Sequence, residues 1–249
     1  MSSLSSNILI NPQDLFDITV AGTVGTTSGV YNDGAKLGCL AVTGDGREFR
    51  YAIAGASALV PGNLLQGSAE TTGWERLAIA ASAAGTTSIT TTTTITATAN
   101  QLIGGYAVVS TTPGIGYNYK ISGNTAASGA VATIYLEDPI QVALTTASQV
   151  SLVADPFNGV IVTTGSSEGT AAVVGVAVAA TPATYYGWIQ IAGPANVLTS
   201  GTIVVGESVV ESTGTAGAVI AATSVSPVVG YAMQGITSGQ NGPIYLTIS

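Results

Sequence analysis

The chain has 249 residues, of which only 7% are charged, and it carries a net charge of −8 with a pI near 4.1. An acidic chain repels phosphate, and a mean hydropathy of +0.49 is too high for intrinsic disorder, so composition argues against nucleic-acid binding and against a disordered protein. The chain has no histidine, which excludes Ser-His-Asp and Cys-His nucleophiles and histidine metal sites. The exposed faces of helices are usually rich in Glu, Lys and Arg, so the scarcity of these three residues favours an all-β fold.

Residues 1–15 are predicted to form an extended arm. Serine, asparagine and proline dominate this stretch, and it has neither the basic start nor the long apolar core of a signal peptide. An arm of this kind is ordered when a partner holds it, so its apolar side chains are candidate interface residues. They are Leu4, Ile8, Leu9 and Ile10, followed by Phe16 at the start of the next region.

Residues 16–76 are predicted to form an N-terminal β region. The pair Asp45-Gly46 separates two apolar stretches, residues 37–43 and 47–53, and predicts a hairpin with a type I′ turn. In the second stretch Phe49, Tyr51 and Ile53 alternate with other residues, which places them on one face of a strand.

Residues 77–165 are predicted to form a middle β domain. A helical turn or two is expected near 75–84, and the β-branched run around 90–94 predicts one strand over 87–98. Further strands are expected at 105–111, 116–122, 130–137, 140–145, 149–154 and 160–164. Short strands at this spacing are typical of a β-sandwich or barrel.

A glycine- and serine-rich linker at 165–169 is predicted to precede a C-terminal domain, residues 170–249. Its strands are expected at 172–179, 185–192, 202–205, 208–211, 217–222, 228–233 and 243–248. The longest apolar block, 171–180, is too short for a membrane-spanning helix, so no membrane partner is expected. All five bases lie at or before Lys120, while the last 129 residues hold six acids and no base.

The residues that usually carry chemistry form no catalytic pattern. Cys39 lies in an apolar stretch and is expected to be an inert buried thiol. Glu137 and Asp138 are adjacent, so a strand would point them to opposite faces rather than pair them for acid–base work. The sequence therefore predicts no enzyme, no metal and no cofactor. Tyr186 and Trp188 share one face, which suits core packing, a subunit interface or carbohydrate stacking.

The order of motifs in the C-terminal part resembles the head decoration (cement) proteins of tailed bacteriophages. The matching segments are Val-Gly-Val-Ala at 174–177, Trp-Ile-Gln-Ile-Ala-Gly at 188–193, Ile-Val-Val-Gly-Glu-Ser-Val at 203–209, Val-Gly-Tyr-Ala-Met at 229–233 and Pro-Ile-Tyr-Leu-Thr-Ile at 243–248. The stretch Asp-Gly-Arg-Glu-Phe-Arg-Tyr-Ala at 45–52, before Pro-Gly-Asn-Leu-Leu at 61–65, is similar to phage virion structural proteins. The middle region has no matching pattern.

This resemblance implies a structural protein on the outer surface of a virion. Such a protein would bind the major capsid protein between capsomers as a homotrimer, partly through its arm. The expected architecture is all-β, with two or more small β-barrel or β-sandwich domains and the extended N-terminal arm. An alternative is a head-fibre, tail or other surface protein that binds host glycans through the middle domain.

Overall fold

The computed structural model describes residues 8–9, 37–166, 170–223 and 227–248. These residues contain strands and turns but no helix, which confirms the all-β prediction. The strands are β1 (Ile8–Leu9), β2 (Leu40–Val42), β3 (Glu48–Ala54), β4 (Leu64–Gln66), β5 (Leu77–Ala78), β6 (Ser88–Thr90), β7 (Ile95–Ala97), β8 (Tyr106–Val109), β9 (Asn118–Asn124), β10 (Ala127–Ala130), β11 (Thr133–Leu136), β12 (Gln149–Val153), β13 (Asn158–Val162), β14 (Val173–Ala177), β15 (Tyr186–Leu198), β16 (Ser208–Glu211), β17 (Val219–Ala221), β18 (Val228–Ala232) and β19 (Asn241–Thr247).

The chain forms two compact units. Among the described residues, the first unit contains 37–69 and those from 156 to 248, together with β1, and the second contains 70–155. The predicted regions 16–76 and 170–249 therefore do not form separate domains, because strands from both belong to one eleven-stranded sheet. The second unit begins and ends earlier than the predicted middle domain, since β13 joins the first unit after Asp155.

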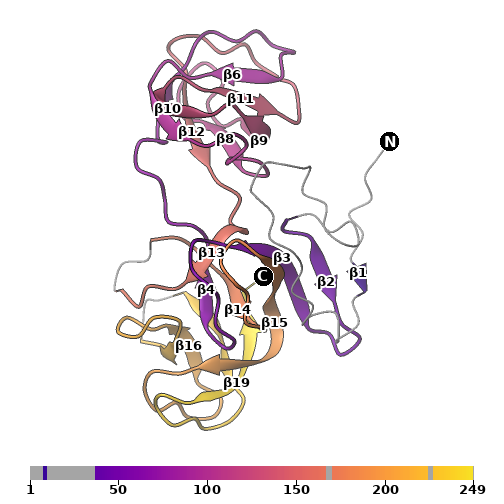
Figure 1. Cartoon of the computed structure of the whole chain (residues 1–249), viewed down its shortest axis with the longest axis vertical. Coiled ribbons are helices and arrows are strands. Elements are labelled where there is room, and N and C mark those ends of the chain that lie inside the picture. Colours follow the sequence, from indigo (N-terminus) through magenta and orange to yellow (C-terminus); the bar gives the residue numbers. More distant parts are fainter. Residues whose placement is uncertain (1–7, 10–36, 167–169, 224–226, 249) are drawn as a thin grey trace. The chain divides into compact units, whose positions relative to one another are not determined.

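Five strands of the first unit close into a barrel (Figure 1). Neighbours run in the order β3, β13, β4, β14 and β15, and β15 pairs again with β3 to complete the ring. All five strands contribute to one buried cluster, whose members include Ala52, Leu65, Val160, Val174 and Ile189. A barrel with so few strands has a narrow interior, which fits the mixture of alanine and valine with a few larger aliphatic side chains in this cluster.

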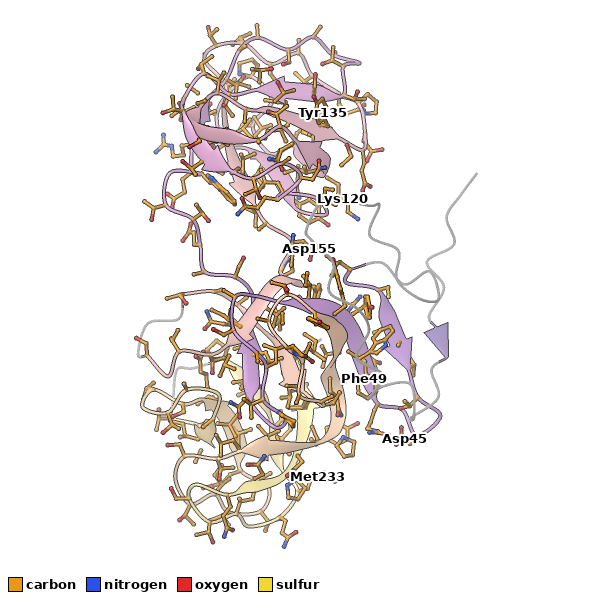
Figure 2. All side chains as sticks on the ribbon, in the orientation of Figure 1. Asp45, Phe49, Lys120, Tyr135, Asp155 and Met233 are labelled. Atoms are coloured by element: carbon orange, nitrogen blue, oxygen red, sulfur yellow. The ribbon has the colours of Figure 1, made fainter. Side chains whose placement is uncertain are left out.

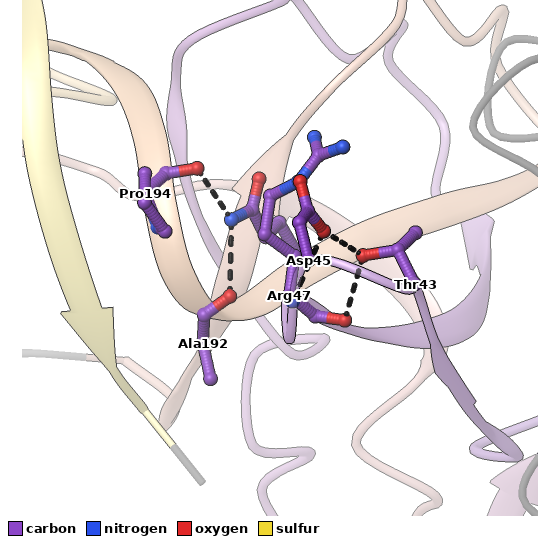
Figure 3. Close-up of polar contacts among 6 residues, drawn as sticks. Thr43, Asp45, Arg47, Ala192 and Pro194 are labelled. Atoms are coloured by element: carbon purple, nitrogen blue, oxygen red, sulfur yellow. Dashed lines mark hydrogen bonds and ion pairs between the residues drawn. The ribbon is translucent and has the colours of Figure 1, made fainter.

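The long strand β15 belongs to two sheets and bends where it passes between them. Its first half pairs with β3 and its second half with β19, and Ala192 has partners in both. The pairing register shifts between Gln190 and Ala192. The buried Gln190 amide Nε2 donates to the backbone oxygens of Ala192, at 3.0 Å, and Pro194, at 2.8 Å (Figure 3). The side chain thus supplies hydrogen bonds to carbonyls at the bend.

The second half of β15 starts a curved sheet in the order β15, β19, β18, β16 and β17. A bridge between Thr199 and Val219 brings β17 back to the end of β15. The apolar core of this curved sheet includes Val197, Val209, Ile244 and Leu246. Along β19, the buried Ile244 and Leu246 alternate with the exposed Tyr245 and Thr247, as expected for a sheet with one solvent-facing side.

The second unit contains a six-stranded sheet in the order β5, β12, β8, β9, β11 and β6, and a two-stranded sheet of β7 and β10. A bridge between Ile79 and Thr91 links the ends of β5 and β6, so the two edges of the larger sheet meet. One apolar cluster fills this unit, with Leu102, Ile121 and Ile134 fully buried. The regular spacing of short strands, which predicted a β-sandwich or barrel in the middle region, thus corresponds to a small curved sheet that surrounds the core of the second unit.

Three local predictions are wrong. The hairpin after β2 forms as predicted, but only Gly46 has a positive φ, and Gly46 N–H donates to Thr43 O at 2.9 Å. This is a three-residue loop with a glycine bulge rather than a type I′ turn. No helix forms at 75–84, because Leu77 pairs with Val150 in β5. The single strand expected at 87–98 is two strands, β6 and β7, that pair with different partners.

Two further predicted strands are reduced to isolated bridges. The segment 140–145 contributes the bridge between Ser82 and Leu144, and the segment 202–205 contributes the bridge between Ile203 and Ile236. Leu144 and Ile203 are nevertheless buried, which explains their apolar character. The predicted linker at 165–169 lies mostly outside the described residues.

Candidate functional site

The predicted arm is described only at Ile8 and Leu9. Their backbones form β1, which pairs in parallel with Ala41 and Val42 at the edge of the eleven-stranded sheet. The other arm candidates, Leu4, Ile10 and Phe16, lie outside the described residues. The arm thus uses backbone pairing at a strand edge, the same chemistry by which a peptide adds to a sheet.

The two aromatic candidates in β15 are buried. The Tyr186 ring stacks on Tyr51 at 5.9 Å between centroids, and the Trp188 ring tilts against Tyr51 at 4.9 Å. Both belong to an apolar cluster with Phe49 and Ile53 on β3. The structure therefore places Tyr186 and Trp188 in the core, one of the interpretations that the sequence leaves open, so neither of these two rings is exposed for an interface or for a sugar.

The other chemical candidates remain apart. Cys39 is half-buried and in the reduced form. Glu137 lies on an exposed surface with its Oε1 atom 4.0 Å from Lys120 Nζ, and Asp138 is also exposed. Within the described ranges, no three His, Cys, Asp or Glu side chains gather as a metal-binding group, and no helix is long and apolar enough to span a membrane.

A cavity of about 460 Å³ lies in the first unit, among β14, β16, β18 and β19. We call it the Glu211 pocket, because Glu211 is the only ionisable group among the lining residues that the structure describes. These residues are Ser166, Ala171, Ala172, Val173, Glu211, Thr213, Pro227, Val228, Val229, Thr247 and Ile248. The walls are therefore mainly aliphatic, with one carboxylate and a few hydroxyls.

The carboxylate of Glu211 is poorly satisfied. Its Oε1 atom is buried and has no hydrogen-bond partner among the described residues. Burial also raises the pKa of the Glu211 side chain, because removing water disfavours the charged form. A buried acceptor without a donor is uncommon in folded proteins and calls for an explanation.

Sequence reasoning missed this pocket. Glu211 is one of six acids after Lys120, and nothing in its neighbours Val209 and Val210 marks it. The pocket arises only because β16 ends beside β14 and β18, which are distant in sequence. The position of Glu211, a single acid at the end of the otherwise uncharged strand β16, was the one feature of the sequence that could have pointed to the pocket.

The burial of Glu211 predicts a pH-dependent effect on stability. A raised pKa means that ionisation of this side chain opposes folding; this cost is absent while Glu211 is protonated in both states, grows as pH rises above its pKa in the unfolded chain, and is complete above its pKa in the folded state. We expect Glu211→Gln to stabilise the protein at pH 7, by at most about 1 kcal/mol because Glu211 keeps part of its hydration.

Chemical denaturation of both proteins from pH 3 to pH 8 measures this difference. The gain should vanish below the ordinary glutamate pKa of 4.5, where Glu211 is protonated in both folded and unfolded chains. Glu207→Gln removes an exposed charge from the same unit and is the matched control. A variant that is less stable than the parent at pH 7 would contradict this account.

An exposed apolar face covers the outside of β18 and β19. Tyr231 lies directly opposite Tyr245 across the two strands, and both side chains are close to half exposed. Met233, two residues after Tyr231 and just beyond the end of β18, is equally exposed (Figure 2). We call Tyr231, Met233 and Tyr245 the tyrosine face. Adjacent exposed aromatics are typical of association surfaces.

A second exposed face lies on the six-stranded sheet of the other unit. Tyr106 pairs with both Val153 and Lys120, and all three side chains are exposed. Tyr135, on β11, is also exposed (Figure 2). This face combines aromatic rings with the Lys120 and Glu137 charges.

Comparison of the chain with family models, with curated proteins and with solved structures found no match.

Proposed function

We propose that this protein is a structural component of a phage virion that decorates and stabilises the capsid. It binds the major capsid protein between capsomers on the outer surface, as a homotrimer. The observation that carries the proposal is the tyrosine face, because its residues belong to the segments 229–233 and 243–248 that resemble decoration proteins.

The tyrosine face has the chemistry of a protein interface. Tyrosine contributes a large apolar ring at low entropic cost and a hydroxyl that satisfies a polar partner. Tyr231 and Tyr245 are adjacent on a paired, rigid backbone, so they are preorganised for a flat partner. Their inward neighbours Ala232 and Ile244 are buried, which holds the two strands in place.

The charge distribution also suits the outer surface of a capsid. The last 129 residues contain six acids and no base, so this part of the chain is repelled by nucleic acid. A decoration protein must bind the shell without competing for packaged DNA. The acidic C-terminal part is consistent with that requirement.

Removal of the tyrosine face tests the proposal. We expect the double variant Tyr231→Ser, Tyr245→Ser to lose at least about tenfold in affinity for expanded capsids, because two aromatic contacts are removed together. Cosedimentation of the full chain with capsids that lack it measures binding, and capsid melting measures stabilisation. Tyr135→Ser, which removes an equally exposed ring from the other unit, is the matched control.

The parent protein should bind in a saturable manner and raise the capsid melting temperature. Thermal unfolding of the double variant alone should match that of the parent, since both rings face solvent. Capsids that bind no parent protein would overturn the proposed function. Equal losses in the double variant and in Tyr135→Ser would show that the tyrosine face is not the contact.

Deletion of residues 1–15 tests the arm separately. We expect this truncated chain to lose capsid attachment and to keep its fold, because the described part of the arm contributes only the two-residue strand β1 at a sheet edge. Circular dichroism checks the fold and cosedimentation checks attachment. Unchanged attachment would show that the arm does not hold the protein on the shell.

The exposed face of the second unit favours one alternative, a surface protein that binds host glycans. Tyr106 and Tyr135 could stack on sugar rings, while Lys120 and Glu137 could bond to hydroxyls. A glycan array probed with the full chain tests this function. Specific binding that Tyr135→Ser abolishes, together with no capsid binding, would favour the alternative.

A further inference from the structure

We propose that the Glu211 pocket binds the cationic end of a lysine or arginine side chain from another protein, with Glu211 as its counter-ion. This inference goes beyond the proposed function and does not rest on it, because it concerns a cavity rather than the tyrosine face. It holds for any partner that presents a basic side chain.

The first argument is the unsatisfied carboxylate. Glu211 Oε1 is buried, and no described residue donates a hydrogen bond to it or brings a neutralising charge into the lining. A buried carboxylate is stabilised when a positive group donates a hydrogen bond to it. An ammonium or guanidinium group in the pocket would therefore supply the hydrogen bond and the opposite charge that Glu211 lacks.

The second argument is the shape and chemistry of the walls. Val173, Val229 and Ile248 line the cavity with aliphatic surface, and Thr213 adds an exposed hydroxyl. Lysine and arginine combine a long apolar stem with a charged end, so one side chain matches both the walls and Glu211. A volume of about 460 Å³ falls in the range of ordinary ligand pockets.

The third argument is the source of the cation. The sequence has no lysine or arginine after Lys120, so the part of the chain that forms this pocket supplies none. Among the described bases of the first unit, Arg47 pairs with Asp45, and Arg50 donates to Gly38 O. Another protein is therefore the expected donor.

Binding of single capped amino acids to the full chain tests the proposal directly. The probes are N-acetyl-lysine methylamide and N-acetyl-arginine methylamide, and the matched neutral probe is N-acetyl-norleucine methylamide. Titrations followed by the methyl signals of Val173, Val229 and Ile248 report on the pocket. We expect both basic probes to shift these signals, and the neutral probe to bind about tenfold more weakly because it lacks the charged hydrogen bond.

Two variants separate the role of the charge from that of the fold. Glu211→Gln keeps the shape of the side chain and should weaken the basic probes about tenfold, leaving the neutral probe unchanged. Glu207→Gln changes the net charge equally, from an exposed position outside the lining, and should leave all affinities unchanged. Thermal unfolding confirms that both variants are folded.

The dependence on pH adds an independent readout. Because Glu211 is the only ionisable residue in the described part of the lining, affinity for the basic probes should fall as pH drops through its pKa in the parent and stay constant in Glu211→Gln. Equal binding of neutral and basic probes, or undiminished binding by Glu211→Gln, would overturn the proposal. Neither result depends on capsid binding, so failure here is distinct from failure of the proposed function.

Discussion

Trp188→Ala is expected to lower the free energy of unfolding of the first unit by about 3–5 kcal/mol. Trp188 is 9% exposed and packs on Tyr51, its cross-strand partner on β3. The pairing of β3 with β15 is the contact that closes the five-stranded barrel. Truncation of the indole therefore leaves a cavity beside the pair of strands that completes the ring.

The two tryptophans allow the effect to be assigned to one unit. Trp74 is buried in the core of the second unit, so its fluorescence in Trp188→Ala reports on that unit alone. Circular dichroism during urea unfolding reports on both units. We expect an early transition by circular dichroism and an unchanged midpoint by Trp74 fluorescence.

Trp188→Phe, which keeps a ring in the cluster, is the matched control and should cost less than the alanine variant. A Trp188→Ala protein whose urea midpoint equals that of the parent would show that the aromatic cluster contributes little. A parallel loss in the Trp74 transition would show that the two units unfold together.

Gly230→Ala is expected to destabilise the second sheet of the first unit by about 1–3 kcal/mol. A Cβ atom on Gly230 would lie 2.3 Å from the backbone oxygen of Tyr245 and 3.0 Å from a methyl carbon of Ile244. Backbone cannot move away as a flexible side chain can, so β18 and β19 must separate. The same change would disturb the opposed Tyr231 and Tyr245 rings.

Gly235→Ala is the matched control, because the nearest atom to its Cβ would be Ile203 O at 3.8 Å and its φ is not positive. Alanine there is expected to be neutral or slightly stabilising, since it restricts the unfolded chain. Thermal unfolding of both variants measures the difference. Equal melting temperatures for the two variants would contradict the close approach of β18 to β19 at Gly230.

Local sequence patterns predicted individual strands well where pairing is local or alternation is clear. The expected strand at 208–211 coincides with β16, and those at 228–233 and 243–248 correspond to β18 and β19. The β-branched run around 90–94 led to the wrong prediction of one strand over 87–98, where the structure has β6 and β7. High β-propensity does not show where one strand ends and the next, with another partner, begins. Leu77 likewise joins β5 through Val150, a partner 73 residues away.

The candidate sites were less predictable, because they depend on which strands become neighbours. The alternation of residues predicted that Tyr186 and Trp188 lie on one face of a strand. It could not predict that Tyr51 packs against both rings and helps to bury that face. Tyr231 and Tyr245 are exposed for the opposite reason, since nothing in the described part of the chain packs over their rings. Glu211 lies in a cavity, as the only charge among its described lining residues, through strand pairings that no short-range pattern encodes.

The sequence by itself determined the all-β class, because few charged helix formers and many β-branched and glycine residues leave strands and turns as the favoured local structures. Its positional charge pattern also fixed an acidic C-terminal part. Only the tertiary structure decided that β3 and β4 share a barrel with β13, β14 and β15, and that β15 continues into a second sheet. Hydrogen bonding between strands is non-local, so the same alternating pattern is compatible with many neighbours until packing selects one.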